Sequence, residues 1–253
     1  MPTIVALTSG SPHSWIVVNA VAAEYGPITV LVERRPSRIS LFLRRMKRHG
    51  IFWALGQAGF TLLQVIVARM SRLRVSQVLQ ENRLDDKPNP TCRVVPIDSV
   101  NSAQCRAALH EFQPEIVLVH GTQLIRAETL ACLPRITLNF HSGINPKYRG
   151  QAGGYWALAQ GDPEHAGATV HIVDKGVDTG PVVHQAPFRS GPRDNFSTYF
   201  YLQAAVLRDL ALRTIDDILA GRLRTYTPDL PSRQFYHPTL WSYVWIGLTM
   251  GVW

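Results

Sequence analysis

Three polar side chains, those of Asn139, His141 and Asp178, have residue types and spacing that suit catalysis. Apolar and polar residues alternate from Ile136 to His141, which predicts a strand whose successive side chains point to opposite faces. Asn139 and His141 therefore share one face. Pro146 follows shortly afterwards and indicates a loop, so we expect both polar groups where a strand runs out into a site.

An uncharged amide beside an imidazole suits a carbonyl oxygen that gains negative charge during acyl transfer. Asn139 donates a hydrogen bond without carrying charge, and His141 donates from both ring nitrogens when it is protonated. Asp178 lies in the turn Gly176–Gly180. A carboxylate near the imidazole favours the imidazolium and can relay a proton through water. These residues predict transfer of a small acyl group to a nucleophile that the substrate supplies.

The segment Thr137–Gly180 resembles the core signature of the folate-dependent formyltransferases. Asn-X-His, a Pro-X-Tyr-Arg-Gly loop and a later Asp-X-Gly recur there in this order. The family includes the glycinamide ribonucleotide, methionyl-tRNA and sugar N-formyltransferases. The resemblance implies that Asn139, His141 and Asp178 are catalytic, that 10-formyltetrahydrofolate is the donor, and that a primary amine is the acceptor. It is strong from Glu115 to Pro187.

The resemblance also implies which residues bind the two substrates. In the family, the loop that corresponds to Gly121–Ile125 wraps the pterin of the folate, mostly through backbone groups. The implied donor-binding residues are Gly121, Thr122, Gln123, Leu124, Ile125, Asp174 and Val177. The implied acceptor-binding residues are Ser9, Gly10 and Ser11 in the first turn, with Tyr148 and Arg149.

Other residues near the signature have less specific patterns. The turn at Gly10 precedes a helix and suits an anion, but no dinucleotide or P-loop glycine pattern is present. Arg149 either holds its loop or contacts a phosphate, and His171 is expected to be structural or to act behind the catalytic groups. Gly143 and Asn145 depart from the Ser-Leu-Leu of many members, in a loop that faces the acceptor in the family.

The elements that must position these residues alternate between strands and helices. Strands are predicted at 3–8, 27–33, 92–97, 115–120, 136–141, 167–173 and 181–186, and helices from residue 12 and at 101–112, 127–133 and 198–219. This α/β pattern predicts a Rossmann-like, mostly parallel sheet flanked by helices. We expect a catalytic domain over residues 1–190 with a helical insert at about 36–82, and a C-terminal helix and aromatic tail over 191–253 packed on it.

The insert contains most of the excess positive charge. Residues 34–74 contain ten Lys or Arg and no acidic residue, so the rest of the chain has 16 basic and 18 acidic residues. The nineteen residues Gly50–Ala68 carry no charge, close to the length of a spanning helix. Gln57 and Gln64 favour a packed helix or lid instead. Aromatic residues beside a basic flank keep an interfacial membrane contact through 38–74 as the alternative. A true span is disfavoured because it would interrupt the sheet.

The composition is that of a globular enzyme, with 46% hydrophobic and 17% charged residues in 253. Three scattered cysteines, Cys92, Cys105 and Cys132, have no metal-ligand spacing, so neither a disulfide framework nor a metal site is expected. The first residues lack the pattern of a secretory signal. We therefore expect a cytoplasmic protein, either free in the cytoplasm or peripheral to the membrane.

The features outside the signature predict a nucleotide-linked amino sugar as acceptor. Methionyl-tRNA enzymes of the family carry an additional C-terminal barrel, and glycinamide ribonucleotide enzymes lack such an insert and aromatic tail. We therefore expect a small-molecule substrate and no nucleic acid. The alternatives are glycinamide ribonucleotide as acceptor, or hydrolysis of 10-formyltetrahydrofolate. The proline- and aromatic-rich tail Arg224–Trp253 either packs on the domain or helps to recognise the acceptor.

Overall fold

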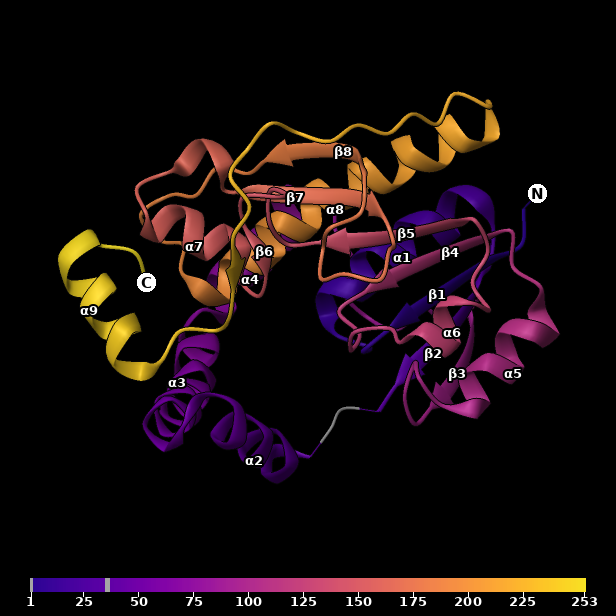
Figure 1. The fold of residues 1–253 in the computed structure, drawn as a ribbon. Coiled ribbons are helices and arrows are strands. Elements are labelled where there is room, and N and C mark those ends of the chain that lie inside the picture. Colours follow the sequence, from indigo (N-terminus) through magenta and orange to yellow (C-terminus); the bar gives the residue numbers. More distant parts are fainter. Residues whose placement is uncertain (1, 35–36) are drawn as a thin grey trace.

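The computed structural model of the protein describes residues 2–34 and 37–253, and its main feature is a β-sheet. The strands of this sheet are Ile4–Thr8 (β1), Thr29–Glu33 (β2), Arg93–Ile97 (β3), Ile116–His120 (β4), Ile136–His141 (β5), Gly167–Ile172 (β7) and Val182–Pro187 (β8). Within the described residues they form one seven-stranded sheet in the order β3-β2-β1-β4-β5-β7-β8 (Figure 1). Strands β1 to β5 are parallel, whereas β7 runs antiparallel to both β5 and β8. The predicted mostly parallel sheet is confirmed.

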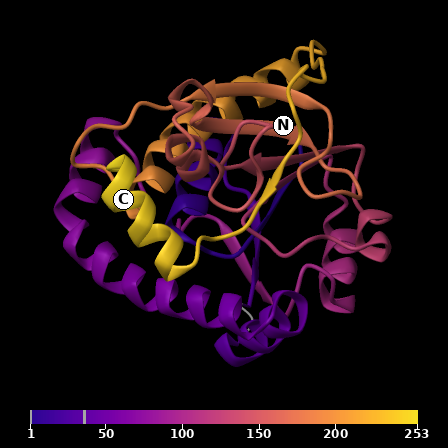
Figure 2. The ribbon, with the colours of Figure 1, turned by 60° about the vertical axis from the view of Figure 1, so that its left-hand side comes forward.

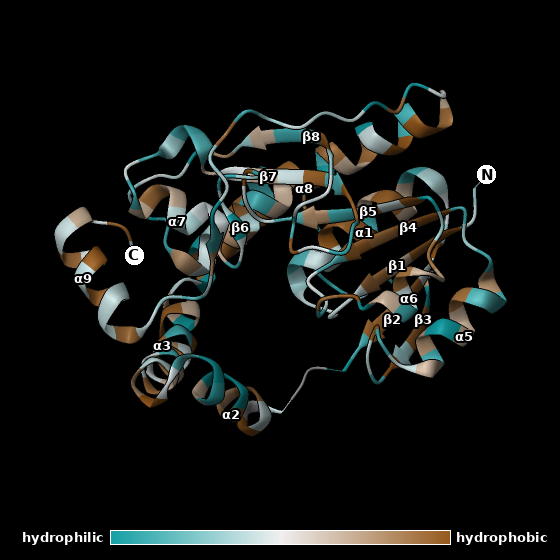
Figure 3. Ribbon diagram, viewed as in Figure 1, coloured by the Kyte–Doolittle hydropathy of each residue, from teal (hydrophilic) through white to brown (hydrophobic). Residues whose placement is uncertain are grey.

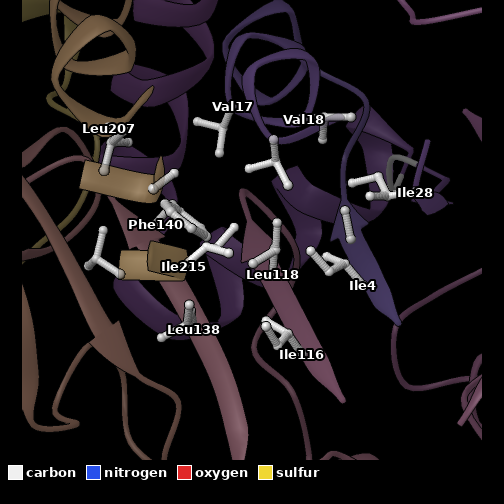
Figure 4. Close-up of a cluster of buried hydrophobic side chains, with 14 of the residues drawn as sticks. Ile4, Val17, Val18, Ile28, Ile116, Leu118, Leu138, Phe140, Leu207 and Ile215 are labelled. Atoms are coloured by element: carbon white, nitrogen blue, oxygen red, sulfur yellow. The ribbon is translucent and has the colours of Figure 1, made fainter. Parts of the chain in front are cut away.

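Alternate residues of the central strands enter two different cores, because successive strand side chains point to opposite faces. Ile4 and Ala6 of β1 pack with α1 (Pro12–Tyr25) and α8 (Phe196–Leu219) on one face. Figure 4 shows this core. Val5 and Leu7 pack on the other face with α5 (Ala103–Phe112).

The strand order reverses between β1 and β4, where β2 and β3 lie to one side and β5 lies to the other. Ligands in such sheets bind at the carboxyl ends of the strands beside this reversal. The predicted helix at 127–133 is shorter in the structure, since α6 (Ala127–Leu130) gives way to turns that reach Leu133. Pro134 follows directly, and a proline disfavours helical backbone in the residue before it.

Three helices form the insert between β2 and β3: α2 (Arg38–His49), α3 (Ile51–Met70) and α4 (Arg72–Glu81). Helix α2 packs on α3, and both α3 and α4 pack on α8. Gly50 separates α2 from α3 with a φ of +86°, a conformation that favours glycine. The predicted start of the insert at residue 36 and of the catalytic domain at residue 1 lie outside the described residues.

The C-terminal tail is more ordered than its proline-rich composition suggested. It contains a short strand, Gln234–Phe235 (β9), and a helix, Leu240–Met250 (α9), that the sequence reasoning did not predict. Strand β9 pairs in parallel with Arg149–Gly150 (β6), in the loop that follows β5. Helix α9 lies beside α3 (Figure 2).

A second hydrophobic core, rich in aromatic residues, joins the insert to the tail. It also includes α7 (Gly153–Ala159), which is followed by a 3₁₀ turn at Pro163–His165. The Phe60 ring of α3 is 3% exposed and lies 4.9 Å from Phe196 of α8 and 5.1 Å from Tyr243 of α9. Edge-to-face aromatic pairs of this kind add to the stabilisation that burial gives. The core therefore fixes the insert, the long helix and the tail to one another.

We expect Phe60→Ala to lower the free energy of unfolding by about 3–5 kcal/mol, because it removes a ring from this core and leaves a cavity. Phe52→Ala in the same helix is the matched control. The Phe52 ring is 79% exposed, so its removal should change stability by less than about 0.5 kcal/mol. Urea denaturation measures both variants, and equal stabilities would show that α3 is not docked through Phe60.

Candidate active site

A cavity of about 540 Å³ lies at the carboxyl ends of β1, β4 and β5. Its wall is formed by the strand ends, by the loop between β7 and β8, and by the C-terminal tail. Most of the residues expected from the sequence line it. These are Ser11, Gly121, Thr122, Gln123, Leu124, Ile125, Asn139, His141, Asp174, Val177 and Asp178.

The pairing of β5 with β7 places Asn139 opposite His171. The Asn139 amide nitrogen lies 2.9 Å from His171 Nε2 and 2.9 Å from Asp178 Oδ1. Nδ1 of His171 lies 2.8 Å from the carbonyl of Ile172 and donates to it, and Nε2 lies 3.5 Å from Asp178 Oδ1 as well as beside the Asn139 amide. His171, which we expect from the sequence to be structural or to act behind the catalytic groups, lines the cavity and lies directly beside the Asn139 amide.

The carboxylate of Asp178 is the centre of the site. Its Oδ1 accepts from Asn139, and its Oδ2 accepts from the backbone N–H of Gly150 at 2.9 Å and lies 3.4 Å from His141 Nδ1. Burial alone would raise the pKa of Asp178, but contacts with His141, His171 and the Gly150 N–H together outweigh burial and hold the pKa well below its usual range. The residue has a φ of +51°, which turns its side chain back toward β5.

His141 is held at both ring nitrogens. Nδ1 faces Asp178, and Nε2 lies 2.9 Å from the carbonyl oxygen of Tyr148. Both nitrogens face oxygen acceptors, an arrangement that the imidazolium satisfies with two N–H donors. Gly143 makes this contact sterically feasible, since a Cβ there would lie 2.6 Å from His141 Nε2 and 2.3 Å from the Tyr148 oxygen. A side chain at this position would therefore require the loop to shift.

The loop after β4 is fixed by a buried carboxylate from β2. Glu33 accepts hydrogen bonds from the backbone N–H of Gln123 at 2.9 Å and from its side-chain amide at 3.0 Å. Asn101 adds a second attachment by donating to the carbonyl of Leu124 at 2.9 Å. Because both attachments come from behind the loop, the Gly121–Ile125 segment presents a fixed edge to the cavity.

His120, which sequence reasoning did not single out, ends β4 at the cavity wall. Burial, with smaller contributions from the charges of His13 and His141, lowers the pKa of His120 to about 3, so the ring is neutral near neutral pH. Its Nδ1 atom is buried and has no hydrogen-bond partner among the described residues. A neutral imidazole nitrogen of this kind suits a polar group of a bound ligand.

Tyr148 and Arg149 do not line the cavity, in contrast to the expectation that they contact the acceptor. The Tyr148 ring is buried in the second core, and its hydroxyl donates to Asp162 at 2.8 Å. Arg149 donates to the carbonyl of Val177 at 2.8 Å and to the Ser232 hydroxyl at 2.9 Å, so it holds its loop.

The first turn is only partly at the cavity. Ser11 lines it and caps α1, where its side chain accepts from the backbone N–H of Ser14 at 3.3 Å. Ser9 and Gly10 are not among the residues that line the cavity. The predicted anion contact of this turn therefore rests on Ser11 and the N-terminus of α1.

The tail supplies a cavity wall that the sequence indicated only through its aromatic content. The lining includes the four consecutive residues Gln234–His237. Their backbone is placed by the pairing of β9 with β6, and Gln151 N–H continues it with a hydrogen bond to the Phe235 carbonyl at 2.9 Å. At Gly150 the φ is +92°, and a Cβ would lie 2.3 Å from the same carbonyl, so this pairing requires glycine.

Comparison with known proteins gives one consistent result. A family model described as formyl transferase matches residues 65–200, just over half of the chain. Methionyl-tRNA formyltransferase of Kosmotoga olearia is 31% identical over 143 residues, which are 56% of this chain and 45% of that protein. The corresponding protein of Thermodesulfovibrio yellowstonii is 33% identical over 132 residues, 48% of this chain and 42% of that protein. The chain thus spans less than half the length of these curated relatives.

Solved structures share the fold at lower sequence identity. Glycinamide ribonucleotide transformylase 1 from Symbiobacterium toebii superposes with a TM-score of 0.58 and 20% identity, over 92% of both chains. A sugar N-formyltransferase from Shewanella gives 0.58 and 14%, over 92% of this chain and 75% of that one. The N-formyltransferase from Helicobacter canadensis gives 0.57 and 13%, over 93% and 71%.

We expect Asp178→Asn to slow formyl transfer, the reaction that the sequence indicates, by a factor of about 10²–10⁴. An amide at this position has no charge to hold His141. Only one of its two terminal atoms is an oxygen, so it cannot accept from both Asn139 and Gly150. Asp162→Asn is the control, because Asp162 lies outside the cavity and pairs with Lys147 at 2.6 Å. Steady-state rates of both variants provide the comparison, and similar rates would remove Asp178 from the catalytic centre.

Tyr148→Phe tests the placement of this ring away from the cavity. Removing the hydroxyl deletes its hydrogen bond to Asp162, which should lower the free energy of unfolding by about 1 kcal/mol. The KM values for donor and acceptor should stay at their wild-type values. A higher acceptor KM without a loss of stability would restore Tyr148 to the binding surface.

Proposed function

Because this chain belongs to the formyl transferase family, we propose that it transfers a formyl group from 10-formyltetrahydrofolate to the primary amine of a nucleotide-linked amino sugar. The chemistry rests on the cluster of Asn139, His141 and Asp178 at the cavity. The choice of acceptor rests on one observation, the contact between the basic end of α2 and the aromatic tail at the cavity wall.

The three central residues divide the chemical work. When bound, the folate donor supplies the formyl carbon, which gains a bond to the acceptor nitrogen as its bond to the folate nitrogen breaks. Asn139 and His141 are the N–H donors nearest this centre, and redirecting one hydrogen bond toward the formyl oxygen would stabilise the charge that develops there by about 2–4 kcal/mol. Such contacts often form fully only in the reactive complex.

Asp178 acts first by holding His141 and Asn139. Its low pKa keeps it ionised and makes it a weak proton acceptor. We therefore assign the proton released by the attacking amine to a relay through water next to this carboxylate, which would deliver it to the departing folate nitrogen. The backbone N–H of Gly150 keeps one carboxylate oxygen in place while the other holds Asn139.

The donor side of the cavity fits a folate. The exposed side chain of Leu124 gives an apolar contact for a flat ring, and the unpartnered Nδ1 of His120 gives a polar one. The loop Gly121–Ile125 lies between them and is fixed from behind by Glu33. The Helicobacter canadensis protein of the same fold was solved with folinic acid and dTDP-3-aminofucose. This supports a folate and a nucleotide sugar as the pair of substrates here.

The acceptor side is cationic and aromatic. Arg48 of α2 donates to the Tyr236 hydroxyl at 3.1 Å, with its guanidinium 5.5 Å from the ring centroid. The Trp53 and His49 rings are tilted against each other at a centroid distance of 4.3 Å, and both rings face Tyr236 edge-on. A guanidinium suits a diphosphate and partly exposed rings suit a base, so this corner has the groups that a nucleotide diphosphate requires.

A mass-spectrometric assay tests this function. The protein is mixed with 10-formyltetrahydrofolate and a panel of dTDP- and UDP-linked amino sugars, glycinamide ribonucleotide and methionyl-tRNA. We expect one nucleotide sugar to gain a formyl group. Formylation of glycinamide ribonucleotide or of tRNA instead would replace the proposed acceptor, and release of formate without a formylated product would indicate hydrolysis.

Arg48→Ala then tests the acceptor corner. Loss of one charge-assisted contact to phosphate should raise the acceptor KM by about tenfold, equivalent to about 1.4 kcal/mol, without changing the donor KM. Arg44→Ala, also on α2, is the matched control because no contact of Arg44 with the tail is present among the described residues. Equal acceptor KM values for the two variants would exclude α2 from acceptor binding.

A further inference from the structure

Helix α3 has one face packed on the protein and one apolar face in contact with solvent. Phe60 and Gln57 point inward, and Gln57 donates a hydrogen bond to the carbonyl of His237. The outward face carries Phe52, Leu55, Leu62, Ile66 and Met70, whose spacing follows the period of a helix. Leu62 is 64% exposed and Ile66 is 58% exposed. We call these five side chains the α3 stripe.

Helix α2 is amphipathic and lies against α3. Ile39, Leu43 and Met46 are exposed at intervals of four and three residues, which places them on one side of the helix. No side chain described for α2 is buried. The side that carries Arg48 faces the tail, so the apolar side points away from the cavity.

Helix α9 extends the apolar surface. Trp241, Trp245 and Leu248 are exposed with helical spacing, and Trp245 is 65% exposed. The helix is seated directly on α3, where a Cβ at Gly56 would lie 2.5 Å from the Trp241 ring. Residues 234–253 contain no Lys, Arg, Asp or Glu. Figure 3 shows hydrophobic residues on α2, α3 and α9, which lie at the end of the molecule away from α5.

The sequence that forms α2, α3 and most of α4 carries charge of a single sign. From residue 34 to residue 80 the sequence contains ten Lys or Arg and no acidic residue. Arg44, Lys47, Arg69 and Arg72 are exposed and have no ion-pair partner within the described ranges. Apolar side chains bordered by unpaired cations are complementary to an anionic lipid surface.

A second copy of the chain fits this surface less well. A two-fold interface sets the same patch against itself, which would bring these unpaired cations together. A single span also fits poorly. Helix α3 is long and apolar enough to cross a membrane, yet its inward face is fixed to α8 and α9 by the second core. The helix therefore suits a position in the plane of the interface.

We propose that the surface formed by α2, the α3 stripe and α9 docks the protein peripherally on anionic membranes. The apolar side chains of α3 and α9 enter the headgroup region, with Trp245 at its boundary, and the cations of α2 and α4 contact lipid phosphates. Helix α2 also contacts the tail through Arg48, so docking holds the acceptor corner close to the headgroups.

Vesicle flotation of the full chain tests this proposal. We expect binding to vesicles of phosphatidylglycerol with phosphatidylcholine at low salt, weaker binding at raised salt, and little binding to phosphatidylcholine alone. Arg44→Glu combined with Lys47→Glu should weaken binding by more than about tenfold, at about 1 kcal/mol for each charge removed. Leu62→Asp combined with Ile66→Asp should also abolish flotation. Leu219→Asp at the end of α8, an exposed leucine outside this surface, should float like the wild type.

Tryptophan quenching by brominated lipid gives an independent readout, and Trp245→Phe should remove most of the quenching. Absence of flotation with anionic vesicles at low salt would overturn the proposal. So would binding that is indifferent to lipid charge and to the Arg44 and Lys47 substitutions. A dimer in sedimentation analysis that Leu62→Asp with Ile66→Asp dissociates, without vesicle binding by the wild type, would assign the surface to a second copy instead. Wild-type formyl-transfer rates for these variants in lipid-free solution keep this result separate from the catalytic proposal.

Discussion

The carboxylate of Asp178 is the constraint on which the rest of the site depends. A buried charge is tolerated only where opposite charges and N–H donors compensate for lost hydration. Here the compensation comes from Asn139 and His141 on β5 and from Gly150 on β6. The left-handed backbone at Asp178 points the side chain at these partners, at a conformational cost that their contacts must offset. Asn139 and His141, the proposed catalytic donors, are therefore positioned by one anion that they contact.

This dependence extends to the end of the chain. Gly150 is held by the pairing of β6 with β9, and β9 is held by the second core through Phe235. The same core includes Phe60 from the insert and Tyr243 from α9. A continuous series of contacts thus links helices outside the sheet to a hydrogen bond on the Asp178 carboxylate. The insert and the tail are part of the architecture of the site, although neither supplies the three central residues.

Helix α2 has a different environment on each of its two sides. One side brings Arg48 to Tyr236 at the cavity wall, and the other carries Leu43 and Met46 into solvent. Because the helix has no buried side chain among those described, its own packing gives it little stability. Its amphipathic pattern is better explained by the tail on one side and the proposed lipid surface on the other than by a role in the core of the protein. This is why the two proposals, for the acceptor and for the membrane, meet on the same helix.

The sequence by itself determined the order along the chain of the seven strands of the main sheet, and it singled out Asn139, His141 and Asp178, which the structure brings together. Periodicity identified these strands because a strand buries either alternate side chains or nearly all of them, and both patterns are visible in the sequence. The Asn-X-His spacing places both side chains on one face of their strand. Tertiary structure decided what local pattern does not encode. The Tyr148 ring points inward because the second core buries it and Asp162 accepts the hydrogen bond of its hydroxyl. The pairing of β5 with β7 places His171 opposite Asn139. The tail reached the cavity because a backbone hydrogen-bond ladder, which side-chain periodicity does not specify, placed it beside Gly150.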